Sequence, residues 1–166
     1  MKDFMRNHRH VPFLLLVLCF SSIFANAASP GASTDIEIKV FFSNPKLPAF
    51  DNDCGAGEFV TRKLPSTPAV ADAALKLLFA GPTETEKAKG MEGIASLGKY
   101  YRGVSIRKGV AIVNFRPGAE EHLRVNGPLC MQDQVLAQII NTLKQFATIK
   151  SVEYAINGKI IKEWDV

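Results

Sequence analysis

The segment Pro128–Phe146, PLCMQDQVLAQIINTLKQF, is the strongest structural signal in the sequence, because its apolar residues recur at the spacing of one helix face. At about 100° per residue they fall within an arc of roughly 140°. Full burial of such side chains is worth about 1.5–3 kcal/mol each, so this helix would contribute on the order of 10–20 kcal/mol before entropy is subtracted. The apolar face consists of Leu129, Val135, Leu136, Ile139, Ile140, Leu143 and Phe146. The opposite side consists of Gln134, Gln138, Asn141, Lys144 and Gln145.

A second helix is predicted over Thr67–Ala80, where small and branched apolar residues occupy a wide arc. Thr67 is a suitable N-cap, and Pro68 suits the first helical position because its missing N–H costs nothing there. Gly81 ends the helix. Thr83 and Glu86 then have the spacing of a capping box, which predicts a brief further helix ending near residue 90.

Strands are predicted before, between and after these helices along the sequence. Alternating apolar residues indicate a strand over Asp35–Phe42, and the apolar run Val110–Phe115 indicates a strand central in a sheet. The pairs Lys108–Gly109 and Asn157–Gly158 suit two tight hairpin turns. The remaining strand segments are 58–64, 100–107, 152–156 and 160–164. We therefore expect an α+β fold, a two-layer sandwich with two main helices packed on one face of a mixed sheet of about four to six strands.

The N-terminus has the features of a secretory signal peptide over residues 1–27. Basic residues precede an apolar run over Val11–Phe24, and Ala25, Asn26 and Ala27 provide a small-x-small cleavage site. Lipid attachment at Cys19, after Leu16, Val17 and Leu18, and an uncleaved anchor remain alternatives. Residues 28–34 are predicted to be a disordered leader, and residues 35–166 a single domain. The protein is therefore expected in the periplasm, cell envelope or extracellular space, with no membrane span after cleavage.

The charge balance gives little support to nucleic-acid binding. Without residues 1–27 the chain keeps 17 basic and 15 acidic side chains, so the basic pI belongs partly to the signal segment. The nearest approach to a basic, aromatic patch is the segment Lys99–Arg102, which is more typical of a solvated strand edge. No nucleic-acid partner is expected.

Export places Cys54 and Cys130 in an oxidising compartment, which predicts a disulfide between them. In the chain-entropy model a bridge of this span stabilises by about 4 kcal/mol. A redox-active thiol pair is the alternative, but the close Cys-x-x-Cys spacing is missing. Asp51, Asp53 and Gly55 resemble the start of a calcium loop, yet Arg62 stands where a bidentate Glu is needed. We therefore predict a solvated loop that is held by the disulfide and binds no metal.

Three groups of residues are candidates for function. A catalytic role as a peptidoglycan-acting hydrolase would use Glu120, Glu121 and His122. Binding of cell-wall glycan would use the rings of Tyr100, Tyr101 and Trp164. Protein binding would use a sheet face that no helix covers, unless the loops after Ser43 and Arg116 fold over it. The residues expected on that interaction surface are Phe41, Tyr100, Tyr101, Val113 and Phe115.

The order of several short motifs resembles the GerMN domain, the sporulation and spore germination module, over residues 36–166. The motifs are Ala74–Thr83 with Glu86, then Val113–Phe115, Leu136–Ile139, Asn141–Leu143, Gln145–Phe146, Ile156–Lys159 and Trp164–Val166. The resemblance implies an extracytoplasmic, non-enzymatic module of envelope and spore-associated proteins, with a fold akin to domains that build ring-shaped assemblies. It implies no catalytic residue and no cofactor. We therefore expect binding to an envelope protein, or self-association.

Overall fold

A computed structural model describes residues 34–123 and 129–161. The predicted signal peptide, with Cys19 as the alternative site of lipid attachment, most of the leader, and Trp164 lie outside these residues. The strands are β1 (Asp35–Ser43), β2 (Gly57–Pro65), β3 (Tyr101–Arg107), β4 (Val110–Phe115), β5 (Ser151–Ile156) and β6 (Lys159–Ile160). The helices are η1 (Pro48–Asp51), α1 (Val70–Ala80), α2 (Glu84–Ala88), α3 (Ala95–Gly98), α4 (Glu120–Leu123) and α5 (Leu129–Lys144). The α+β class is confirmed.

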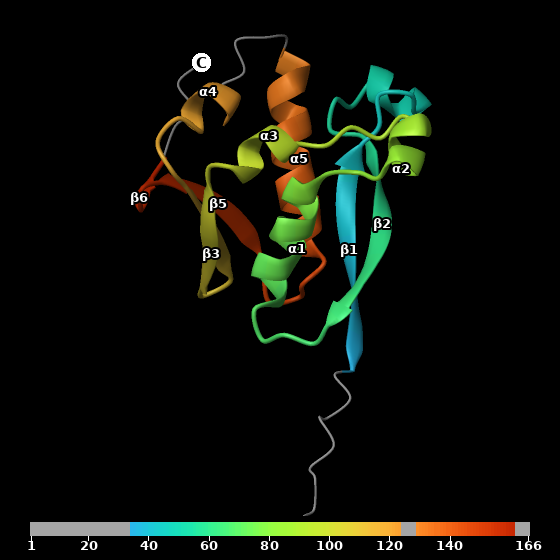
Figure 1. Cartoon of the computed structure of the whole chain (residues 1–166). Helices are drawn as coiled ribbons and strands as arrows, with labels where there is room; N and C mark the ends of the chain where they lie inside the picture. Colours follow the sequence, from blue (N-terminus) through green and yellow to red (C-terminus); the bar gives the residue numbers. More distant parts are fainter. Residues whose placement is uncertain (1–33, 124–128, 162–166) are drawn as a thin grey trace, which may run out of the picture. The chain divides into compact units, whose positions relative to one another are not determined.

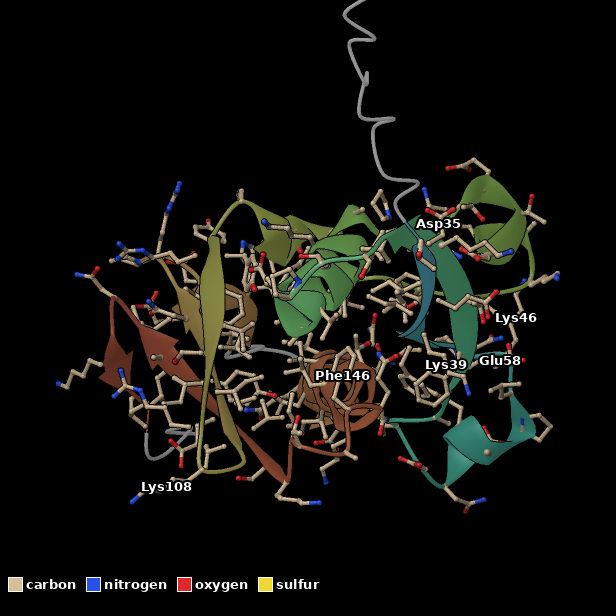
Figure 2. All side chains as sticks on the ribbon, turned by 90° about the horizontal axis from the view of Figure 1, so that it is seen from below. Asp35, Lys39, Lys46, Glu58, Lys108 and Phe146 are labelled. Atoms are coloured by element: carbon tan, nitrogen blue, oxygen red, sulfur yellow. A yellow bond between two sulfur atoms is a disulfide. The ribbon has the colours of Figure 1, made fainter. Side chains whose placement is uncertain are left out.

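The strands form two sheets. β1 and β2 pair with each other in an antiparallel hairpin, and the other four strands form a mixed sheet in the order β3-β4-β5-β6. β4 is central as predicted, antiparallel to β3 and parallel to β5. The two main helices, α1 and α5, lie between the hairpin and the four-stranded sheet (Figure 1; Figure 2). Both sheets therefore supply apolar side chains to the helices.

The two hairpin turns predicted from sequence are confirmed. Lys108 and Gly109 have φ values of 50° and 84°, and Asn157 and Gly158 have values of 50° and 82°. Positive φ at both central residues is the requirement of a type I′ turn, whose twist matches that of the flanking strands. These turns fix the register of β3 against β4, and of β5 against β6.

Helix α1 begins later than predicted. Its N-cap is Ala69, without a side-chain cap, and the Thr67 hydroxyl oxygen accepts a hydrogen bond from Ala69 N at 3.2 Å in the preceding turn. The capping box of α2 is confirmed, with Thr83 and Glu86 each accepting a bond from the other's backbone N–H. The largest fully buried side chains include Phe42, Leu75, Leu78, Leu97, Val113, Phe115, Leu123, Ile139 and Leu143.

The polar side of α5 is not wholly solvated, which corrects the simple amphipathic prediction. Thr142 and Gln138 are 0% and 2% exposed. The reason is that this side of the helix lies along the free edge of β1. Thr142 Oγ1 accepts a hydrogen bond from Phe41 N at 3.0 Å, and Gln138 Nε2 donates one to Ser43 Oγ at 3.2 Å.

Two short helices lie where the sequence predicts neither a helix nor a strand. α3 buries Leu97 and α4 buries Leu123, and each segment has only four helical residues. Four residues are too few for an amphipathic period to be recognised in a sequence. Both helices place an apolar side chain on the core formed by α1, α5 and the four-stranded sheet.

Candidate interaction surface

The predicted disulfide is confirmed: Cys54 and Cys130 are joined, with their Cα atoms 4.9 Å apart. The bridge ties the loop between β1 and β2 to the first turn of α5. In that loop Asp53 Oδ1 accepts a hydrogen bond from Gly55 N at 2.8 Å, so the carboxylate is used in a turn. Within residues 34–123 and 129–161, no group of three or more His, Cys, Asp or Glu side chains is placed to hold a metal ion.

The predicted exposure of Val113, Phe115 and Phe41 is wrong. Val113 and Phe115 are both 0% exposed, since they lie on the face of β4 that α1 and α5 cover. Phe41 is 7% exposed and packs edge-on against Phe59, with ring centroids 5.0 Å apart. Alternating residues of β4 point to opposite faces. The face that the two main helices do not cover carries Val110 and Ile112 instead, both half-buried.

The two adjacent tyrosines have different surroundings. Tyr101 Oη donates a hydrogen bond to Asp72 Oδ1 at 2.7 Å, and its ring lies 4.9 Å from that of Phe79. Burial, and then the Asp72 carboxylate, raise the pKa of the Tyr101 phenol. The ring centroid of Tyr100 instead lies 5.2 Å from that of His122, and Lys99 Nζ lies 4.8 Å from the Tyr100 ring centroid. The two rings therefore do not form one aligned platform.

Two of the three predicted catalytic residues line a pocket of about 280 Å³. Glu121 and His122, from α4, line it together with Gln134 and Gln138 of α5. Gln138 Oε1 is buried there and has no hydrogen-bond partner among the described residues. Glu120 is directed elsewhere, since its carboxylate accepts a hydrogen bond from Gly118 N at 2.6 Å. The structure thus brings together two of the three residues.

The acidic side chains whose pKa is shifted, Asp72 and Glu86, belong to pairs that hold elements of the fold together. Two hydrogen bonds, of 2.8 and 2.6 Å, join the Arg62 guanidinium to the Glu86 carboxylate and link β2 to α2. The bonds from Arg62 lower the pKa of Glu86 to about 2. Burial pushes the pKa of Asp72 upward, but bonds from Lys76 and Tyr101 outweigh it and lower that pKa.

A larger groove of about 570 Å³ lies between the end of α1, α2 and the loop after β1. Its wall includes the glycines at 81, 90 and 93. A Cβ atom at Gly93 would come within 2.4 Å of Pro82 Cδ, which explains why this close chain approach needs glycine. The charged residues of its lining are Lys46, Lys87 and Glu92.

The outer edge of β3 is a candidate site that the sequence does not identify, although the segment Lys99–Arg102 is predicted to lie at a solvated strand edge. β3 is the first strand of its sheet, and its ladder to β4 pairs Arg107 with Val110 across a two-residue turn. In such a hairpin the residues flanking the turn exchange hydrogen bonds, so the alternate residues, Val104 and Ile106, direct their N–H and C=O groups away from β4. Ile106 is 45% exposed. We call this strand side the β3 edge.

A small apolar slot accompanies the β3 edge. It has a volume of about 150 Å³ and lies between the strand and the start of α1. Its lining consists of Pro68, Ala69, Val70, Ala71, Asp72, Val104 and Ile106. The sequence signal that could have located the edge is the absence of any acidic residue between positions 99 and 110, where four are basic.

In the described part of the chain, no helix combines the length and apolar character needed to cross a membrane.

Comparison with known proteins gives a family and a fold. A search of curated proteins finds no match. The tandem GerMN domains of the sporulation protein GerM from Bacillus subtilis align with a TM-score of 0.54 and 20% identity, over 80% of this chain and 43% of that one. The first GerMN domain of the same protein gives a TM-score of 0.49 and 20% identity, over 79% and 90%.

The chain therefore spans less than half the length of the tandem-domain structure. At 20% identity the likeness of the two structures shows the fold. The model of the family described as sporulation and spore germination matches residues 39–162, which is most of the chain. The chain belongs to this family, the Germane or GerMN domains.

Proposed function

We propose that this protein is an exported, non-enzymatic module of the cell envelope that binds another protein through the β3 edge and serves sporulation or germination. The observation that carries the proposal is an edge strand with outward-directed backbone groups and a 45% exposed isoleucine beside an apolar slot. Open edges are sites where a further strand can pair, and natural sheets usually protect them. An edge left open beside a slot favours a role in recognition.

Export is supported by two separate features. Residues 1–27 have the pattern of a signal peptide, and the Cys54–Cys130 disulfide suits an oxidising compartment. Fusion of alkaline phosphatase behind residue 34 tests this, because that enzyme becomes active only where disulfides form. We expect activity in intact cells, and loss of activity when residues 11–24 are deleted. Equal activity of both fusions would refute export by this segment.

Binding at the β3 edge is tested by site-specific crosslinking in the native envelope. A photoreactive amino acid replaces Ile106 in one strain and Lys63, on the exposed strand β2, in a matched control strain. We expect a discrete crosslinked protein product from position 106 and a much weaker one from position 63. Equal labelling at both positions, or labelling only at position 63, would contradict the choice of the β3 edge.

A hydrolase is the second candidate, because Glu121 and His122 share a pocket wall. A carboxylate and an imidazole at one pocket could exchange protons with a substrate. Zymography on peptidoglycan, with the wild type and Glu121→Gln compared, separates the two candidates. Clearing by the wild type but not by the variant would favour the hydrolase.

Sedimentation with cell-wall glycan, comparing Tyr100→Ala with the wild type, tests glycan binding in the same preparation.

A further inference from the structure

We infer that the β3 edge takes an extended acidic segment of the partner protein, which adds to the four-stranded sheet as a fifth strand and seats an aliphatic side chain in the slot. This inference rests on the proposed function and specifies the chemistry of the partner. It comes from three features of the same strand: its backbone, the slot beside it and the charges around it.

The backbone supplies the first feature. Gly109 O accepts hydrogen bonds from Lys150 N and Ser151 N, which sets the odd-numbered residues of β4 toward β5. The even-numbered residues of β4 therefore pair with Arg107, Ser105 and Gly103 of β3. That leaves the N–H and C=O groups of residues 104 and 106 directed outward. A partner strand can make main-chain hydrogen bonds with both residues.

The slot supplies the second feature. The side chains of Val104 and Ile106 are on the inner face of β3 and form one wall, and the first turn of α1 forms the other. Asp72, the acidic residue in the lining, is already bonded to Tyr101 and paired with Lys76 at 2.8 Å. The remaining lining residues are apolar. A volume of about 150 Å³ suits one aliphatic side chain of an added strand.

Charge supplies the third feature and decides the kind of segment. Lys99, Arg102, Arg107 and Lys108 are all exposed. Lys108 lies at the tip of the β3–β4 hairpin (Figure 2). Arg102 donates a hydrogen bond to the neutral Asn157 side chain, and none of the four basic residues has a salt bridge within the described ranges. Lys99 lies over the Tyr100 ring and Arg102 is bonded toward β5, so Arg107 and Lys108, beside the outward-directed residues 104 and 106, are the charges that an acidic strand would complement.

The outer edge of β2 lacks this combination. Its Arg62 is held by Glu86, and its Lys63 lies 3.7 Å from Glu37, so its charges are matched within the domain. Pro65 ends the strand and removes a donor. A polyanion such as nucleic acid or an anionic cell-wall polymer would match the charges of the β3 edge. It would use neither the outward backbone groups nor the apolar slot, so the structure favours a peptide strand.

Peptide binding tests the inference directly. The probe is a fluorescent seven-residue peptide of alternating Glu and Val, titrated with protein purified after expression of the full chain, and followed by fluorescence anisotropy. Matched peptides replace every Glu by Lys, or the central Val by Pro. We expect at least about tenfold weaker binding for each matched peptide, since one loses charge complementarity and the other a main-chain donor. Equal binding of the Pro peptide, or full displacement by polyphosphate at matched charge, would overturn strand addition.

Variants of the protein keep the test independent of folding. Ile106→Pro removes one outward donor that the β3–β4 ladder does not use, and Thr61→Pro makes the same change on the β2 edge. Ala69→Leu fills the slot from an exposed position. We expect Ile106→Pro and Ala69→Leu to weaken peptide binding by about tenfold or more, with Thr61→Pro close to the wild type. Thermal melts report whether each variant is folded.

The two proposals can fail separately. If position 106 crosslinks to a protein but the acidic peptide binds no better than the basic one, the interaction surface stands and the acidic-strand chemistry is wrong. If position 106 yields no crosslink in the envelope, the proposed function fails at this site whatever the peptides do.

Discussion

The side chain of Gln145 brackets the backbone of Lys39: Gln145 Oε1 accepts from Lys39 N at 2.9 Å, and Gln145 Nε2 donates to Lys39 O at 2.6 Å. One turn earlier, Thr142 accepts from Phe41 N. Helix α5 thereby occupies the position of a third strand beside β1. The edge of β1 is closed by side chains, and Arg62 Nη1 donates to the outward Thr61 O of β2 at 3.5 Å, whereas no described side chain bonds the outward backbone of Val104 or Ile106 in β3. This contrast explains why only part of the sheet surface is open for pairing.

Replacing Thr142 by Val should destabilise the protein. The two side chains have similar shapes, but Val leaves the buried Phe41 N–H without its acceptor, which costs about 1–3 kcal/mol. Urea unfolding measures the change in the free energy of unfolding. Lys144→Ala, at an exposed position of the same helix, serves as the control and should change stability by less than about 0.5 kcal/mol. If Thr142→Val leaves the free energy of unfolding unchanged, water replaces the lost acceptor and the predicted cost is wrong.

The elements most accurately predicted from sequence are those fixed by local chemistry. The turns at Lys108–Gly109 and Asn157–Gly158, and the capping box of Thr83 and Glu86, depend on residues within four positions of one another. The division into two sheets depends on the long-range packing of α5 against β1. No periodicity within one segment reports such packing.

The interaction surface was less predictable for the same reason. β4 is apolar on both faces, so its sequence predicts burial without telling which face the helices cover. The prediction from sequence therefore places Val113 on the wrong face. The disulfide could be predicted because the choice of partners was small: only Cys54 and Cys130 remain once the signal segment is set aside.

Removing the disulfide should lower stability without changing the fold. The bridge joins residues 76 positions apart, and loop-closure entropy at that span corresponds to about 4 kcal/mol. The double variant Cys54→Ser and Cys130→Ser should unfold at a lower urea concentration than the oxidised wild type. Dithiothreitol should lower the wild-type midpoint toward that of the variant and leave the variant unaffected. An unchanged midpoint on reduction would contradict a stabilising role.

A methyl group at Gly57 should be poorly tolerated. A Cβ atom there would lie 2.1 Å from Phe42 O and 2.8 Å from the Phe41 ring, so the β1–β2 hairpin would have to shift. Gly103→Ala is the comparison, because no atom of the described residues, its two chain neighbours aside, lies within 4 Å of its Cβ position and only its φ of +144° is strained. We expect Gly57→Ala to cost several kcal/mol, about 3 or more, and Gly103→Ala about 1–2. Thermal unfolding of both variants gives the order.

The Arg62–Glu86 pair should make stability depend on pH in the acid range. The folded-state pKa of Glu86 is about 2, below its ordinary value of 4.5. A lowered pKa means that the folded state holds the charged form more strongly, so the pair stabilises fully above pH 4.5. That contribution is lost as pH falls from 4.5 toward about 2, because the carboxylate becomes protonated.

Glu86→Gln isolates this effect, since Gln also serves in a capping box but carries no charge. The wild type should be more stable than the variant by about 1–3 kcal/mol near neutral pH, and the difference should shrink as pH falls through that range. Urea midpoints at several pH values give the difference. Arg62→Gln should reduce the dependence of stability on pH similarly, because it removes the main cause of the lowered Glu86 pKa. A wild-type advantage that stays constant down to pH 2 would show that packing, rather than charge, makes this link between β2 and α2 stabilising.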